Sequence, residues 1–322
     1  MTQSSTAAAI LRIGTRGSPL ALAQAREVQR RLAAACGLAA ERLEIKPIRT
    51  SGDMIKDRPL TEAGGKGLFT KEIEEALAAG AIDLAVHSGK DVPTVLPAGL
   101  VLAAFLPRED ARDVLISRRP PASPPRERGW ALPELPQGAV VGTASLRRQA
   151  VLKHLRKDLV VVPLRGNVET RLRKLEDGEC DATVLALAGL KRLGLAAAAT
   201  AVLDPDQFVP AVAQGAIVIE TRVDDGKTRA LVAAIDDPDT ATAVTAERAF
   251  LAVLDGSCRT PIAGHARLQD GSIRFRGLIA KPDGSAALEV SRQGRRADAA
   301  ALGADAGQEL KRRAGPDFFE RS

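Results

Sequence analysis

The 322-residue chain has few of the residues that mark several common classes of protein. It has no tyrosine, one tryptophan and only 2% aromatic residues in total, which leaves few rings on which nucleic-acid bases could stack. Its three cysteines, Cys36, Cys180 and Cys258, are far apart and form no cluster with histidine, so we expect neither a bound metal nor a disulfide framework. No run of about 18 apolar residues occurs, so no membrane-spanning segment or membrane partner is expected.

The chain also has only a small excess of charge of one sign. Lys and Arg number 46 against 40 Asp and Glu, a formal net charge of +6. These basic residues are scattered along the chain, which argues against nucleic acid as a partner. Residues 1–9 lack the basic region and apolar core of a secretory signal, and a reducing compartment suits the three unpaired cysteines, so we expect a cytoplasmic protein.

The remaining composition, 45% hydrophobic and 27% charged, is that of globular protein, and the length predicts two or three domains. Over the first two-thirds, short β-like runs alternate with helical patterns, which predicts an α/β fold with largely parallel sheets. The expected strands are Leu11–Thr15, Leu43–Ile48, Asp83–Val86, Leu100–Phe105, Asp113–Ser117, Ala139–Gly142, Leu159–Pro163 and Ala182–Leu187, and the expected helices are Pro19–Ala35, Gly67–Ala79, Ser145–Leu155 and Asn167–Leu175.

Beyond about residue 236 the pattern changes to short strands separated by Asp-Gly pairs, which are hairpin-turn signals. This pattern predicts a three-stranded antiparallel sheet with one helix before it and one after it. The strands are expected at Ile262–Leu268, Ser272–Ile279 and Ala287–Arg292, and the helices at Thr240–Leu254 and about Asp298–Arg313.

One cysteine stands in a sequence that favours reactivity. Cys258 follows Gly256 and Ser257 on a turn and precedes Arg259, whose positive charge favours the thiolate. The alternative is that Cys258 is a small buried apolar residue, as free cysteines commonly are.

Three loops resemble one another because each leads into the N-terminus of an expected helix and has Arg, Ser, Thr or Asn there. Helix N-termini bind anions through free N–H groups and the macrodipole, and arginine suits carboxylates and phosphates. Consecutive arginines in a first turn oppose the dipole, which a bound anion would explain. The alternative is that these residues are ordinary caps and solvated surface charge. The donors are Arg16, Ser18 and Gln24 in the first loop, Thr143, Ser145, Arg147 and Arg148 in the second, and Arg165, Asn167 and Arg171 in the third.

Two further loops could contribute to a site. Residues 64–71 are Gly-rich without the spacing of a nucleotide-binding loop, and are interpreted as a flap from which Lys66 and Phe69 reach over a cleft. Residues 87–93 follow a strand, where α/β folds place ligands. There Lys90 could bind a carboxylate and Asp91 could stabilise a cation or transfer a proton, although Asp91 could also be only a turn residue; His87 is expected to be a buried hydrogen-bonding residue.

Taken in order, these motifs resemble those of the hydroxymethylbilane synthase family, also called porphobilinogen deaminases. The resemblance covers almost the whole chain, from about Leu11 to Leu310. The matching segments are Ile13–Gln24, Gly64–Glu72, Asp83–Pro93, Gly142–Gln149, Leu164–Leu175, Ala188–Gly194, Pro210–Glu220 and Glu247–Ile262.

The resemblance implies three domains, two of them the halves of a periplasmic-binding-type fold with a cleft between them. They are expected at residues 10–106 with 215–235, at 107–214, and at 236–322. The third is a smaller α+β domain that carries Cys258. The segments Leu106–Arg112 and Val209–Gln214 would connect the two halves as a hinge.

The resemblance also implies the activity. A dipyrromethane cofactor is bound to Cys258 through a thioether, four porphobilinogen molecules are condensed onto it stepwise with release of ammonia, and hydrolysis frees the linear hydroxymethylbilane. No metal takes part. The implied partners are porphobilinogen and oligopyrrole intermediates, the chain is expected to be a monomer, and the product is passed to the next enzyme of the tetrapyrrole pathway.

Each pyrrole ring of such a chain carries an acetate and a propionate, so many cationic side chains are expected around it. Asp91 matches the family's catalytic carboxylate, which stabilises positive charge as the amine departs and as carbon–carbon bonds form. The cofactor- and substrate-binding positions are matched by Arg16, Ser18, Gln24, Lys66, Ser88, Lys90, Thr143, Ser145, Arg147, Arg148, Arg165, Gly166, Asn167, Arg171, Arg192 and Gln214.

Three positions depart from the family's usual pattern. Gly89 stands where Met or Leu is common, Ala213 replaces a frequent glycine, and Arg259 follows the cysteine where Gln is commoner. They affect the expected local flexibility and the environment of the thiol.

Two other functions stay open: a solute-binding module would need neither Asp91 nor Cys258, and a nucleic-acid-binding protein would show strongly salt-dependent affinity. A covalent adduct in the intact mass distinguishes the synthase from both.

Overall fold

The computed structural model describes residues 11–54, 67–118, 132, 135–254, 260–315 and 318. The chain forms two compact units, Met1–Pro107 with Ile217–Ala241 and Arg108–Ala216 with Thr242–Ser322. The backbone therefore passes from one unit to the other after Pro107, Ala216 and Ala241. In the described part of the chain, no helix is both long enough and apolar enough to span a membrane.

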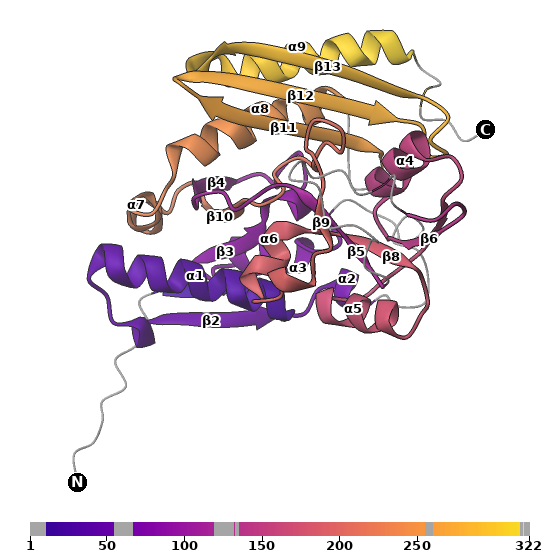
Figure 1. The fold of residues 1–322 in the computed structure, drawn as a ribbon. Helices are drawn as coiled ribbons and strands as arrows, with labels where there is room; N and C mark the ends of the chain where they lie inside the picture. Colours follow the sequence, from indigo (N-terminus) through magenta and orange to yellow (C-terminus); the bar gives the residue numbers. More distant parts are fainter. Residues whose placement is uncertain are drawn as a thin grey trace. The chain divides into compact units, whose positions relative to one another are not determined.

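The first unit is built on a five-stranded sheet (Figure 1). In spatial order its strands are β2 (Leu43–Ile48), β1 (Leu11–Arg16), β3 (Leu84–Ser88), β10 (Ile217–Arg222) and β4 (Leu100–Phe105). The helices of this unit are α1 (Pro19–Cys36), α2 (Ser51–Met54), α3 (Lys71–Ala78) and α7 (Gly226–Ala233), with 3-10 turns η1 (Ala40–Arg42) and η2 (Gly89–Asp91).

Local sequence explains how the longest helix of this unit begins and ends. Ser18 is the N-cap of α1 and accepts a hydrogen bond from the Ala21 amide at 3.3 Å, and Pro19 occupies the first turn. At the other end Gly37 adopts φ +63°, the left-handed conformation that glycine tolerates best. The buried face of α1, with Val28 and Leu32, packs on the core of the sheet.

The second unit contains a sheet of the same design. Its spatial order is β7 (Val160–Val162), β6 (Val140–Gly142), β8 (Ala182–Ala186), β5 (Asp113–Ser117) and β9 (Ala201–Val202). Its helices are α4 (Leu146–Leu155), α5 (Val168–Glu176) and α6 (Leu187–Arg192), followed by the 3-10 turn η4 (Ala196–Ala198).

The same unit also contains the C-terminal antiparallel sheet, drawn in orange and yellow in Figure 1. Its strands are β11 (Ile262–Gln269), β12 (Ser272–Ala280) and β13 (Ala287–Arg295), and its helices are α8 (Pro238–Val253), which enters this unit at Thr242, and α9 (Ala299–Ala314), which follows η5 (Arg296–Asp298).

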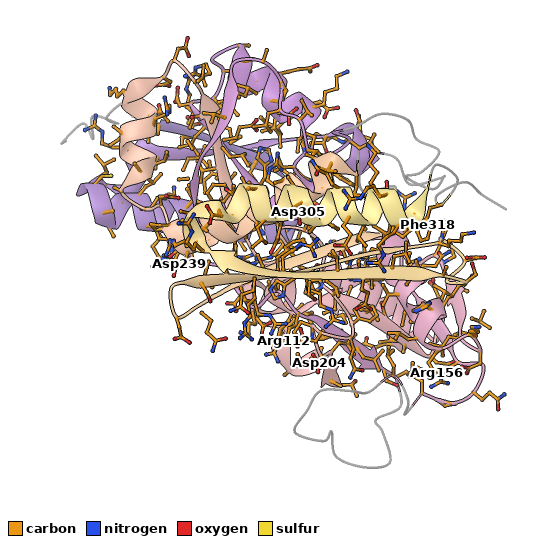
Figure 2. All side chains as sticks on the ribbon, turned by 90° about the horizontal axis from the view of Figure 1, so that it is seen from above. Arg112, Arg156, Asp204, Asp239, Asp305 and Phe318 are labelled. Atoms are coloured by element: carbon orange, nitrogen blue, oxygen red, sulfur yellow. The ribbon has the colours of Figure 1, made fainter. Side chains whose placement is uncertain are left out.

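Helices α8 and α9 approach closely because glycine lies at their contact. A Cβ on Gly303 would be 1.9 Å from the Ala246 carbonyl oxygen. On the sheet side, Arg292 of β13 donates to Asp305 of α9 at 2.6 Å; Figure 2 labels Asp305 on this helix.

The α/β class and the three-stranded C-terminal sheet are confirmed, but the expectation of largely parallel sheets is wrong. Each five-stranded sheet has two parallel and two antiparallel pairings. Strand β10 in the first sheet and β5 in the second make the antiparallel pairings, and each follows a passage of the chain from the other unit. They do not arrive through a βα crossover, which is the connection that makes neighbouring strands parallel.

Candidate functional site

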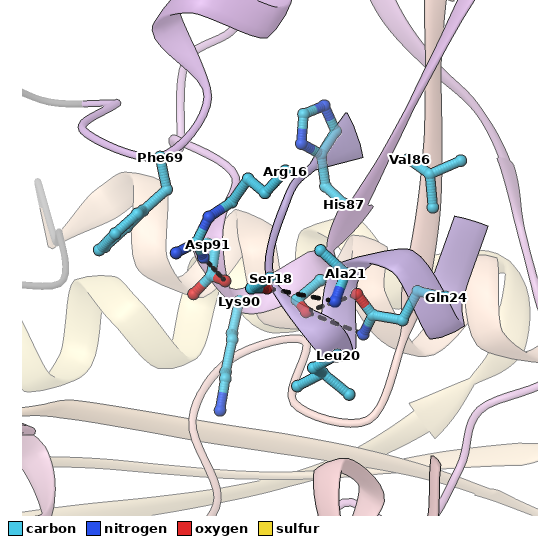
Figure 3. A pocket seen from close by; sticks show the side chains of 11 residues that line it. Arg16, Ser18, Leu20, Ala21, Gln24, Phe69, Val86, His87, Lys90 and Asp91 are labelled. Atoms are coloured by element: carbon cyan, nitrogen blue, oxygen red, sulfur yellow. Dashed lines mark hydrogen bonds and ion pairs between the residues drawn. The ribbon is translucent and has the colours of Figure 1, made fainter. Parts of the chain in front are cut away.

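The first unit gathers six of the predicted site residues at one edge of its sheet. Strands β1 and β3 are parallel, so Arg16 at the end of β1 and the loop after β3 meet at the same edge. A pocket of about 70 Å³ lies there, and Figure 3 shows it from close by. The predicted residues that line it are Arg16, Ser18, Gln24, Ser88, Lys90 and Asp91.

Arg16 and Asp91 place opposite charges in this pocket. Arg16 Nη1 lies 3.9 Å from Asp91 Oδ2, and the two side chains are 23% and 29% exposed. The Arg16 guanidinium also lies over the Phe69 ring, with Cζ 4.2 Å from the ring centroid. Figure 3 shows Arg16 between Phe69 and Asp91.

Asp53 is a partner of Arg16 that sequence reasoning did not place in the site. Its carboxylate accepts hydrogen bonds from Nε and Nη2 of Arg16, and Thr50 Oγ1 donates to it at 2.8 Å. Burial disfavours the charged form of Asp53, but the bonds from Arg16 and Thr50 outweigh burial and hold its pKa below the ordinary value. The position of Asp53 after a predicted strand could have indicated its role. Strand β2 is parallel to β1, and α2 directly follows β2, so Asp53 lies at the same edge of the sheet as Arg16.

Two polar pairs involve further residues that line the pocket. Gln24 and Ser88 are hydrogen bonded, with Nε2 donating to Oγ at 2.9 Å. His87 Nε2 lies 3.1 Å from Glu220 Oε2, and both side chains are almost fully buried. His87 is therefore the buried hydrogen-bonding residue that the sequence predicted. Ser18 caps α1, which was the alternative to a ligand contact.

In the second unit, two predicted arginines share one buried carboxylate. Asp113 accepts from Arg147 Nη2 at 2.7 Å and from Arg148 Nε and Nη2 at 3.1 and 2.8 Å, and Gln214 Nε2 donates to it at 3.0 Å. Burial opposes ionisation of Asp113, but the two guanidinium groups lower its pKa to about 2. Asp113 therefore already supplies one negative charge for the two cations at this helix entrance, which the sequence could not show.

The remaining predicted residues of this unit cap helices or bind nearby carbonyls. Asn167 is the N-cap of α5 and accepts from the Thr170 amide at 2.8 Å, while Arg171 Nε donates to the Gly166 carbonyl at 2.8 Å. The others are placed as follows: Ser145 caps α4, Thr143 Oγ1 accepts from the Ser145 amide, Arg192 donates to the Gly215 carbonyl, and Arg165 precedes Gly166 on the same loop. Cys258 and Lys66 lie outside the described residues.

Fold and site together define an α/β protein that places paired cations and carboxylates at the edge of a mixed sheet. A family model described as "Porphobilinogen deaminase, dipyromethane cofactor binding domain" matches residues 11–230, and one described as "Porphobilinogen deaminase, C-terminal domain" matches residues 241–312. The chain therefore belongs to the porphobilinogen deaminase family.

Curated relatives agree over nearly the full length. A porphobilinogen deaminase of Nitrobacter winogradskyi is 64% identical over 307 residues, which are 95% of this chain and 94% of that one. One of Paracoccus denitrificans is 57% identical over 312 residues, 97% of each chain. Family membership makes the chain a transferase that forms hydroxymethylbilane with dipyrromethane as its cofactor.

Solved structures give a weaker likeness. The periplasmic VFT2 domain of Bordetella pertussis BvgS is 16% identical with a TM-score of 0.41, covering 70% of this chain and 86% of that one. The periplasmic aliphatic sulphonate binding protein SsuA from Escherichia coli is 15% identical with a TM-score of 0.41, covering 75% and 69%. Scores this low carry no conclusion about function.

The arginine cluster of the second unit fits a polycarboxylate cofactor. Two guanidinium groups face one carboxylate, so Arg147, Arg148 and Asp113 together carry a formal charge of +1. Arg147 Nε is buried and has no hydrogen-bond partner among the described residues. An unpaired buried donor is costly, and an additional carboxylate would satisfy both the charge and the donor.

Proposed function

We propose that the pocket of the first unit binds the incoming porphobilinogen and that Asp91 is the catalytic residue. The observation that carries this proposal is the proximity of Arg16 Nη1 and Asp91 Oδ2, 3.9 Å apart in one pocket. Porphobilinogen has carboxylates and an amine, so a cation and an anion at this separation suit the two ends of its charge distribution. Lys90 lines the same pocket and supports binding of a carboxylate.

Asp91 acts electrostatically in this proposal. Its carboxylate stabilises the positive charge that develops on the substrate as ammonia departs and again as the new carbon–carbon bond forms. Gln24 and Ser88 position the wall around it through their mutual hydrogen bond.

In the second unit, Arg147 and Arg148 hold cofactor carboxylates, and Arg165, Arg171 and Arg192 are assigned to the growing polyanion. When bound, the dipyrromethane supplies the acceptor carbon to which the first substrate is joined. We assign its attachment to Cys258, which follows α8 in the sequence. The chain acts as a cytoplasmic monomer and releases its product to the next enzyme of the pathway.

Intact-mass measurement of purified variants, combined with single-turnover assays, tests these roles. Cys258→Ala should lack the covalent adduct, because alanine offers no nucleophile, whereas Cys36→Ala and Cys180→Ala should keep it. Asp91→Asn should keep the adduct and its circular dichroism but lose about 100- to 1000-fold in rate. Asp91→Glu should recover part of the activity. An adduct on Cys258→Ala would move the attachment site, and a folded Asp91→Asn protein with near-normal turnover would reject Asp91 as the catalytic residue.

A further inference from the structure

The orientation of Arg16 depends on residues outside the pocket lining. Its Nε and Nη2 atoms are bonded to Asp53, and its Nη1 atom faces Asp91. We propose that Asp53 is a positioning residue for substrate binding, which fixes Arg16 so that the Nη1 end of its guanidinium presents to a carboxylate of porphobilinogen. The inference rests on the role proposed above for Arg16.

The two ends of the Arg16 guanidinium have different partners, so they can have different roles. Arginine binds carboxylates best through two N–H groups in the plane of its fork, so the edge that is already occupied determines which edge a ligand can use. Asp53 occupies the Nε edge, and the opposite end, at Nη1, lies on the side of Asp91 and the pocket. If Asp53 did not hold this edge, the Arg16 side chain could rotate and present either edge or none.

Asp53 is itself held firmly by short helix α2. Thr50 Oγ1 donates to Asp53 at 2.8 Å, and the Gly52 amide donates to the Leu68 carbonyl at 2.8 Å. A Cβ on Gly52 would lie 2.4 Å from the Phe69 ring, so only glycine lets α2 pack directly against it. The Phe69 ring in turn lies over the face of the Arg16 guanidinium. One edge and one face of the guanidinium are thus fixed by the same pair of packed segments.

Strand β1 carries a second arginine–aspartate pair that serves as a matched control. Arg12 donates to Asp83 through Nε at 3.0 Å and Nη2 at 2.7 Å, the same two atoms that Arg16 uses toward Asp53. Arg12 lies near the start of β1 and Asp83 precedes β3, at the opposite edge of the sheet from the pocket. The Asp83 and Asp53 side chains are 17% and 25% exposed, so the two pairs are similarly shielded from solvent.

The experiment compares holoenzyme carrying Asp53→Asn, Asp83→Asn or Arg16→Gln with the parent protein. We expect Asp53→Asn to raise the KM for porphobilinogen about tenfold while changing kcat less than about threefold, because binding is lost and Asp91 is intact. Asp83→Asn should lower the melting temperature at least as much as Asp53→Asn does, because Asp83 also accepts a hydrogen bond from the Arg12 backbone amide, but it should leave KM unchanged. Intact mass should show the adduct in all three variants, and Asp53→Glu should recover part of the affinity.

A double-variant cycle tests whether Asp53 acts through Arg16. In an Arg16→Gln background, Asp53→Asn should have little further effect on KM. If Asp53→Asn fails to fold, Thr50→Val, which removes only the hydroxyl that holds Asp53, should raise KM in the same direction. An unchanged KM in Asp53→Asn, a KM that falls because Asp53 competes with substrate, or an equal rise in Asp83→Asn would each overturn the inference. An unchanged KM in Arg16→Gln would instead reject the proposed role of Arg16 itself.

Discussion

At the scale of single residues, the carboxylate of Asp113 is a buried charge shared by two arginines. It is completely buried and compensates two arginines that are themselves almost fully buried. Burying such a group is favourable only when its partners stay in place, because removal of one partner leaves an uncompensated charge.

The lowered pKa of Asp113 makes its contribution to stability dependent on pH. A pKa of about 2 in the folded protein, against 3.8 ordinarily, means that the unfolded chain binds a proton more readily. The contribution is therefore fully present above about pH 4 and is lost as the pH falls toward 2, with a magnitude of about 2 kcal/mol.

Urea unfolding of Asp113→Asn across this range measures the effect. At pH 7 the variant should lose about 3–5 kcal/mol of unfolding free energy, because Arg147 and Arg148 are left without their carboxylate. The difference from the parent should shrink as the pH approaches 2. Asp298→Asn, which removes an exposed partner of Arg295, should show a much smaller change. A constant difference for Asp113→Asn down to pH 2 would contradict the assigned pKa.

Six residues that line the pocket were named from sequence, but several of their partners were not. Arg16, Lys90 and Asp91 stand at loops that follow strands, so their clustering at one sheet edge follows from the α/β pattern. Asp53 and Asp113 lie 37 and 34 residues from the arginines Arg16 and Arg147 that they bind. No spacing rule links residues at such separations, and only the folded sheet brings them together.

At the scale of elements, both ends of helix α4 are held by hydrogen bonds, and only the one at its N-terminal end could be predicted from sequence. Its N-terminal cap, Ser145, was visible in sequence. At its C-terminal end, His154 Nδ1 lies 3.2 Å from the carbonyl oxygen of Gly284, in the turn between β12 and β13. The Asp-Gly pair predicted that turn, but not that the turn would pack against the helix that carries Arg147 and Arg148.

Two glycines in the turns of the C-terminal sheet allow backbone strain to be separated from packing. Gly284 and Gly271 have φ of +76° and +74°, so alanine is equally strained at both. A Cβ on Gly284 would lie 2.5 Å from Lys153 Cβ, whereas one on Gly271 would meet nothing within 4 Å. Gly284→Ala should therefore be less stable than Gly271→Ala by about 1–3 kcal/mol in denaturant unfolding. Equal losses would show that the turn can move away from α4 without cost.

The strands and helices themselves were predicted more accurately than their pairing. Patterns of apolar residues located most elements within a few residues, because local periodicity is set by the element itself. The elements that were not expected are β9, β10, α2, α6 and α7. Helix α3 begins at Lys71 rather than Gly67, since Gly67 takes φ +82° in a turn. The direction of β5 and β10 could not be predicted, because it depends on where the chain returns to each sheet.

At the scale of the whole molecule, Glu247 ties together segments of the second unit that flank the passages of the chain between units. It accepts from Arg108 Nη1 and Nη2 at 2.6 and 3.1 Å, from the Ala213 amide at 2.6 Å and from the Ala266 amide at 2.7 Å. Arg108 directly follows one passage and Ala213 precedes another by three residues. Ala213 has φ +57°, a strained conformation for a residue with a side chain, and its bond to Glu247 helps to hold it there.

Glu247→Gln should therefore weaken the second unit selectively. Glutamine keeps the size of the side chain but removes the buried charge opposite Arg108, at a cost of about 3–5 kcal/mol. Differential scanning calorimetry should show part of the unfolding heat at a temperature lower by roughly 2–4 °C for each kcal/mol lost. Unfolding of the first unit should stay near its original temperature, since Glu247 and its three partners all belong to the second. Glu289→Gln removes the carboxylate that pairs with Arg276 at the surface of the same unit and should leave the profile almost unchanged, because exposed pairs contribute little. A Glu247→Gln profile that matches the parent would show that these segments are held by packing alone, with no net contribution from the buried pair.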